Sequence, residues 1–134
     1  MMYIPTDINM VLQILIAAVL FLGVFFIKKH RRSPHGYLMF IVVTLSVLSV
    51  GLVMAPSALR IISGASLSPF EMLVLAHSFL GAISMVLGIY VLLVWRFRRP
   101  EGSCFKVARW MKALAVLWVL SLALGTMMFY ELYY

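Results

Sequence analysis

The sequence predicts an all-α integral membrane protein, a four-helix up-down-up-down bundle with both termini on the external side. Three observations support this prediction. The chain of 134 residues is 65% hydrophobic and 11% charged, whereas soluble globular chains are about 45–50% apolar and about 25% charged. Four apolar stretches approach or exceed the roughly 20 residues that a membrane-spanning helix needs. Basic residues gather in alternate connections between these stretches. A single domain over residues 1–134 accommodates all four spans.

The four predicted spans are apolar on every face, and they lack the alternation of membrane β-strands. The first span has no basic start and no small-residue cleavage site, so we expect it to be retained rather than removed as a signal peptide. Short connections between the spans favour a simple bundle. The predicted spans are Met10–Ile27, Tyr37–Pro56, Glu71–Trp95 and Ala113–Tyr130.

The later spans have recognisable starts. Ser33 is a candidate N-cap for the second span, with Pro34 at the first helical position. Ser68 and Glu71 have the spacing of a capping box and predict the start of the third span. The stretch Pro100–Ser103 predicts a break in the chain before the fourth span.

The basic residues indicate how the bundle is oriented. Ten of the eleven lie in the first and third connections, and only Arg60 lies in the second. The positive-inside rule makes the side with ten basic residues cytoplasmic, in a multi-pass protein of the plasma membrane. The net charge of +7 is then a topology signal and a contact for anionic lipid headgroups, and we expect no nucleic-acid partner. The ten are Lys28, Lys29, Arg31, Arg32, Arg96, Arg98, Arg99, Lys106, Arg109 and Lys112.

His77 is the most informative residue, because an ionisable group inside a membrane span is functional by default. Gly81, Ser84 and Gly88 follow it on the same helix face. Two interpretations stay open. The small residues leave room for a flat ligand such as a porphyrin, or they let another helix pack closely while His77 hydrogen-bonds to it. In both cases we expect His77 to face the bundle interior.

A second histidine, His35, lies at the opposite membrane face, roughly 20 Å from His77 along the membrane normal. One metal ion cannot bind both, so any ligand sites at the two histidines are separate. Met54 is a candidate partner for His77, in a pair that suits haem or copper, and Cys104 is a candidate partner for His35. The alternatives are that Met54 fills the core and that Cys104 is inert. His30 is most simply a solvated loop residue.

The chain also resembles the CtaM-type assembly factors of haem-copper cytochrome oxidases, which are small four-span membrane proteins. The resemblance includes the basic loop that leads into His35-Gly36-Tyr37-Leu38-Met39, the run Leu75-Ala76-His77, and the run Val107-Ala108-Arg109-Trp110 before the last span.

This resemblance implies four histidines, two near each membrane face, of which His35 and His77 match two. Cys104 and Ser57 stand near the positions of the other two, with Met54 one turn before Ser57. The resemblance implies a metal site that includes His35, Cys104 or His77, with haem or copper as the cofactor.

Three functions follow as expectations. The resemblance implies a non-enzymatic accessory protein that helps to assemble a haem-copper oxidase of the respiratory chain. The pattern of a histidine followed by small residues in the third span also resembles b-type membrane cytochromes. This second resemblance implies a haem-binding electron carrier. A small non-catalytic subunit of a larger membrane complex needs no ligand. The sequence contains no catalytic motif for soluble substrates and no carboxylate in the middle of a span, so we expect no enzyme.

Overall fold

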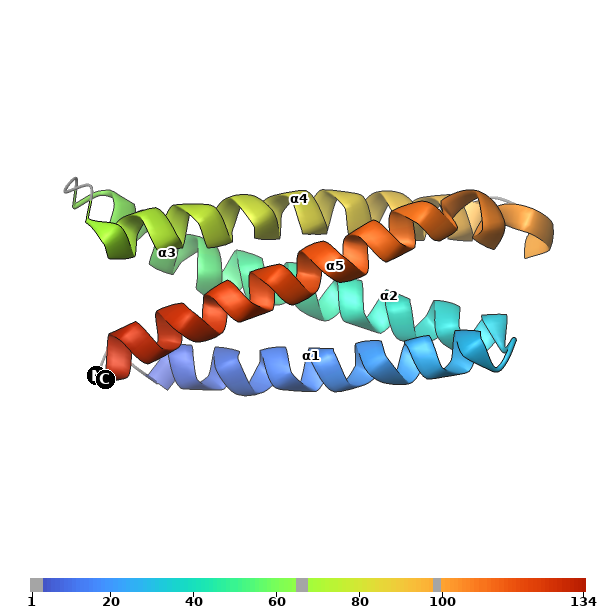
Figure 1. Cartoon of the computed structure of the whole chain (residues 1–134), viewed down its shortest axis with the longest axis horizontal. Helices are drawn as coiled ribbons and strands as arrows, with labels where there is room; N and C mark the ends of the chain where they lie inside the picture. The colour runs from blue at the N-terminus through green and yellow to red at the C-terminus, as the bar shows by residue number, and fades with distance from the viewer. Residues whose placement is uncertain (1–3, 65–67, 98–99) are drawn as a thin grey trace.

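The computed structural model describes residues 4–64, 68–97 and 100–134, and their side chains over residues 7–64, 68–95 and 108–134. These residues form four long helices and no strand, which confirms the predicted all-α class (Figure 1). The second long helix is continuous through a five-residue π-helical turn, η1. The elements are α1 (Ile4–Lys28), α2 (Arg32–Ser49), η1 (Val50–Met54), α3 (Ala55–Ile62), α4 (Pro69–Phe97) and α5 (Pro100–Tyr133).

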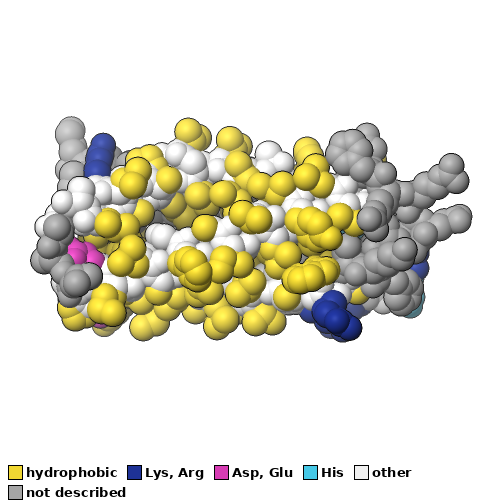
Figure 2. Space-filling view, turned by 90° about the horizontal axis from the view of Figure 1, so that it is seen from above, with side chains coloured by type: hydrophobic (Ala, Val, Ile, Leu, Met, Phe, Trp, Pro, Cys, Tyr) yellow, Lys and Arg dark blue, Asp and Glu magenta, His cyan; other side chains and the backbone are white. Residues whose placement is uncertain are grey.

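The chain is a multi-pass membrane protein. Each of the four long helices contains a segment of 22 to 31 residues that is long and apolar enough to cross a membrane. Large apolar side chains point outward along these segments, with Leu52 74% and Phe79 68% exposed. Figure 2 shows hydrophobic side chains over the middle of the molecule and charged side chains towards its two ends. Lipid therefore covers surfaces that would be unfavourable in water.

The helices run up and down in sequence, and both termini lie at one end of the bundle (Figure 1). We call this the terminal end. The opposite end, which we call the basic end, holds the connections that follow α1 and α4. Helix α5 crosses the bundle obliquely, from beside α4 at the basic end to beside α1 at the terminal end (Figure 1). Because of this crossing, α5 contacts α1 near the two termini, where Tyr133 donates a hydrogen bond to Asp7.

The second span does not end at Pro56, as the sequence analysis predicts, but continues as helix to Ile62. Proline lacks an N–H and its ring collides with the carbonyl four residues earlier in a regular α-helix. The η1 turn lies just before this point, and the Ala55 N–H donates to Val50 O, five residues back. The wider π turn relieves the collision, so the helix passes Pro56 without a break.

The connection between α1 and α2 is shorter than predicted. Ser33 lies inside α2 and is not the N-cap of this helix. Helix α2 begins at Arg32, after Arg31, with no side-chain cap. His30 closes the end of α1 with a positive φ of 57°, and the N–H groups of His30 and Arg31 donate to Ile27 O and Phe26 O. This hydrogen-bond pair is the Schellman arrangement, which usually carries glycine at the left-handed position.

The start of α4 has the predicted capping box. The Glu71 N–H donates to Ser68 Oγ at 3.3 Å, and the Ser68 N–H donates to Glu71 Oε2 at 3.2 Å. The predicted break at residues 100–103 is wrong, because α5 begins at Pro100 and these four residues are helical. Proline is favourable at the first position of a helix, where no N–H donor is needed.

The interior of the bundle is thinly packed. The fully buried apolar side chains include Ile16 and Val74, while the buried polar ones are His35, Ser49, Ser84 and Ser121. Small and polar side chains therefore occupy positions that large apolar residues fill in a dense core. The remaining space is the cavity described next.

Candidate functional site

A cavity of about 980 Å³ runs through the bundle and has walls from all four spans. Its lining is predominantly apolar, and both His35 and His77 border it. Sites for small organic ligands and cofactors are typically about 300–1,000 Å³, apolar, and provided with a few polar groups. The cavity is thus large enough for a ligand of cofactor size.

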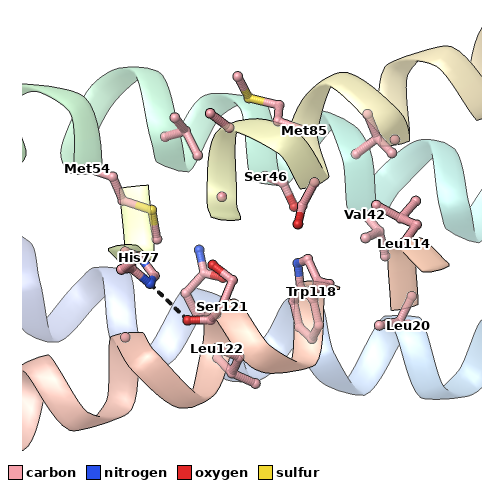
Figure 3. A pocket seen from close by; sticks show the side chains of 18 of the residues that line it. Leu20, Val42, Ser46, Met54, His77, Met85, Leu114, Trp118, Ser121 and Leu122 are labelled. Atoms are coloured by element: carbon pink, nitrogen blue, oxygen red, sulfur yellow. Dashed lines mark hydrogen bonds between the residues drawn. The ribbon is translucent and has the colours of Figure 1, made fainter. Parts of the chain in front are cut away.

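His77 lies on α4 with its ring turned into the bundle, which confirms the predicted orientation. Its Nδ1 lies 2.8 Å from the carbonyl oxygen of Ser121 on α5 (Figure 3). A carbonyl oxygen only accepts, so Nδ1 donates the proton and, in the neutral ring, Nε2 keeps its lone pair. Gly125 makes the approach possible, because a Cβ there would lie 3.0 Å from Cε1 of His77.

The small residues that follow His77 pack against neighbouring helices. A Cβ on Gly81 would lie 3.7 Å from Ser121 Oγ, and one on Gly88 would lie 3.4 Å from Val43 and 3.7 Å from Leu114. The Ser84 hydroxyl donates to Leu80 O within its own helix. Helix α5 therefore occupies the face of the small residues, as the helix-packing interpretation expects, although Gly81 and Gly88 also border the cavity.

Met54, the candidate partner of His77, belongs to the η1 turn and lines the same cavity. In Figure 3 its side chain extends from the turn in the direction of His77. A π-helical turn rotates the residues that follow it relative to a regular helix, so η1 sets the direction of this thioether. The two side chains thus border one space, from the second and third spans.

His35 lies near the basic end in an arrangement similar to that of His77. It is only 6% exposed, and its Nδ1 donates to the carbonyl oxygen of Gly23 on α1 at 2.8 Å. Nε2 again keeps the lone pair in the neutral ring. The two histidines belong to opposite ends of the bundle, His35 near the start of α2 and His77 near the start of α4, as the sequence analysis expects.

The candidate pair of His35 and Cys104 is not placed, because the side chain of Cys104 lies outside the described ones. Among the residues that are described, no three histidine, cysteine or acidic side chains come close enough to hold a metal ion. A metal held by the described residues alone would therefore take fewer such groups, supplemented by methionine or by groups of the ligand itself.

A polar cluster near the terminal end is not among the predicted site residues. Gln13 Nε2 donates to Ser49 Oγ at 2.9 Å, and Ser49 Oγ donates to Asn9 Oδ1 at 2.5 Å. Asn9 and Gln13 also border the cavity, as does Ser46, whose buried hydroxyl oxygen has no hydrogen-bond partner among the described residues. The signal in the sequence is two amides four residues apart in an apolar span, which lie on one helix face.

Comparison with protein-family models, with curated proteins and with solved structures finds no match to this chain.

Proposed function

We propose that this chain is a non-catalytic accessory protein of respiratory membrane enzymes in the plasma membrane, and that it holds a haem or a copper ion at His77 during assembly of a haem-copper oxidase. The observation that supports this most is the hydrogen bond from His77 Nδ1 to the Ser121 carbonyl oxygen. Histidine ligands of metals commonly donate their other ring N–H to a carbonyl or carboxylate, which fixes the ring and leaves Nε2 for the metal.

The surroundings of His77 suit an apolar cofactor. Met54 borders the same cavity, and its thioether is a ligand that haem iron and copper accept alongside imidazole. The cavity volume of about 980 Å³ lies at the upper end of the range for cofactor sites. The oxidase as partner is supported by the resemblance of the His35 and His77 segments to the assembly factors.

A second candidate function is a small subunit of a larger membrane complex with no ligand of its own. It is favoured by the packing of the third span, because Gly81 faces Ser121 and Gly88 faces Leu114 and Val43. In that case the hydrogen bond of His77 ties α4 to α5, and its role is structural.

The test is an absorption spectrum and an elemental analysis of the natively purified chain. We expect a Soret band or stoichiometric copper in the wild type, its loss in His77→Ala, and a shifted spectrum or weaker metal retention in Met54→Leu. His30→Asn is the matched control, because His30 is exposed in the connection after α1 and asparagine tolerates its left-handed conformation, so this variant should leave the haem or metal content unchanged.

The two candidates give different outcomes. If the wild type carries neither haem nor metal but co-purifies with larger membrane chains in stable ratio, the subunit function replaces the cofactor function. If His77→Ala retains full haem or copper content, His77 is not the ligand and the proposed site is wrong.

A further inference from the structure

The ring of His77 lies against a single turn of helix α5. Its Nδ1 donates to the carbonyl oxygen of Ser121 at 2.8 Å (Figure 3). One turn later, a Cβ on Gly125 would lie 3.0 Å from Cε1, 3.5 Å from Nδ1 and 3.8 Å from Nε2 of the same ring. The imidazole therefore occupies space that a side chain at position 125 would need, and glycine leaves that space free.

The other ring nitrogen of His77 faces open space. Nε2 makes no hydrogen bond to any described residue. Among the described residues, the fully buried side-chain nitrogen or oxygen atom without a partner is Ser46 Oγ, so Nε2 is not sealed inside the protein. Because His77 borders the cavity, the lone pair of Nε2 is accessible from the cavity when Nδ1 carries the proton.

The close contact with the ring distinguishes Gly125 from the glycine beside the other histidine. A Cβ on Gly23 would lie 3.6 Å from Nδ1 of His35, an ordinary van der Waals distance, and its tight contact would be with the terminal methyl group of Met39. A methionine end can turn aside. An alanine at position 125 would instead push the His77 ring itself, and a hydrogen bond weakens steeply when its angle is distorted.

We propose that Gly125 is a positioning residue for the site at His77, because the turn from Ser121 to Gly125 holds the imidazole as the Nδ1–H tautomer and keeps the Nε2 lone pair directed into the cavity. The position of the ring is a property of the chain alone, whereas its consequence for cofactor binding rests on the proposed function. A lone pair fixed in this way suits a ligand that accepts an electron pair, such as haem iron or a copper ion, and not an anion.

The first test reads the tautomer of His77 in the full chain without a cofactor. Nitrogen-15 NMR of the reconstituted protein distinguishes a ring nitrogen that carries a proton from one that carries a lone pair, and the signals of His77 are identified by their loss in His77→Gln. We expect the Nδ1–H form in the wild type. Gly125→Ala should lower the ratio of the Nδ1–H to the Nε2–H form roughly fivefold, the factor that corresponds to one net hydrogen bond.

Gly23→Ala is the matched control, because it makes the same substitution beside the other histidine, whose Nδ1 also donates to a backbone carbonyl. We expect it to leave the tautomers of His35 and His77 unchanged. If Gly23→Ala alters His35 as much as Gly125→Ala alters His77, the effect belongs to any glycine replaced in this bundle and the proposal is wrong. A wild type that carries the proton on Nε2 of His77 would also overturn it, whether or not the variants fold.

The second test measures cofactor affinity, with haem and Cu⁺ each titrated into the chain without cofactor. Disturbing the hydrogen-bond partner of a ligating histidine typically weakens metal binding about 10–100-fold, and we expect a loss of this size in Gly125→Ala. Gly51→Ala should bind like the wild type, since a Cβ there meets no heavy atom within 4 Å. A role of Gly125 in helix packing alone would lower stability but leave the affinity and the tautomer of the folded protein unchanged, and that result would refute the positioning role.

The two tests separate this inference from the proposed function. If the wild type binds neither haem nor Cu⁺ while Gly125→Ala still shifts the tautomer of His77, the proposed function is wrong and the positioning of the ring by Gly125 stands. If Gly125→Ala keeps the wild-type tautomer, the positioning role is wrong, whatever the wild type binds.

Discussion

At the scale of single residues, the two membrane histidines make the same kind of hydrogen bond. Each donates Nδ1–H to a backbone carbonyl of another helix, His35 to Gly23 and His77 to Ser121. A glycine lies beside each ring, Gly23 for His35 and Gly125 for His77. Because a histidine nitrogen without a partner is costly in an apolar interior, the bond stabilises the helix pair and sets the ring orientation. The same hydrogen bond therefore serves a histidine that only links two helices and a histidine that binds a ligand through Nε2.

Gly36 gives the first prediction at this scale. Gly36→Ala should lower the free energy of unfolding by about 1–3 kcal/mol, because its methyl group would overlap the rigid Trp95 indole and force α2 and α4 apart. The measurement is thermal unfolding in detergent, followed by circular dichroism at matched lipid content.

Gly51→Ala is the control for this prediction, since no heavy atom lies within 4 Å of a Cβ at that position. Alanine is also the better helix former, so the control should be at least as stable as the wild type. A Gly36→Ala protein as stable as the Gly51→Ala protein would show that Trp95 does not fix the contact between α2 and α4.

At the scale of elements, the helix ends follow two different rules. The start of α4 uses side chains, Ser68 and Glu71, which bond to each other's backbone N–H groups. The junction of α1 and α2 uses backbone alone, with His30 in the left-handed conformation. Only the first kind leaves a residue pattern that can be recognised, which is why the capping box is predicted correctly and the start of α2 is not.

The capping box gives the prediction at this scale. Ser68→Ala should destabilise the protein by about 0.5–2 kcal/mol, because the Glu71 N–H loses its acceptor. Ser68→Thr should retain most of the stability, since its hydroxyl accepts the same bond. Thermal unfolding of the wild type and the two variants measures these differences in stability. An equal loss of stability in both variants would mean that the hydroxyl does not cap α4.

At the scale of the whole molecule, the two ends of the bundle differ in charge and in the polar groups that border the cavity. The terminal end is closed by the Tyr133–Asp7 hydrogen bond and contains the Asn9–Ser49–Gln13 cluster. At the basic end, the exposed residues Lys28 and Lys112 border the cavity. One end of the bundle therefore carries hydrogen-bonded polar side chains, and the other carries most of the basic residues.

The orientation of the bundle gives the third prediction. We expect the basic end to be cytoplasmic, because ten of eleven basic residues flank it. An impermeant maleimide applied to sealed cells should label a cysteine placed as Ser63→Cys in the Cys104→Ser background, and should leave Cys104 unlabelled in the wild type until the cells are opened. Labelling of Cys104 in intact cells would reverse the orientation.

The sequence by itself determined the features that depend on local composition. The four spans, the inward orientation of His77 and the capping box at Ser68 follow from hydropathy, from the cost of burying an ionisable group and from a spacing of three residues. Each of these signals is contained within one helix, so no knowledge of the neighbouring helices is needed.

Only the tertiary structure decided which groups meet between helices. It placed α5 against the small residues after His77, brought backbone carbonyls to both histidines, and lined one cavity with residues of all four spans. Backbone acceptors carry no signature in the sequence, and the crossing of α5 depends on the summed packing of all four spans. Contacts between residues 44 or more positions apart, such as His77 and Ser121, therefore appear only once the helices are in place.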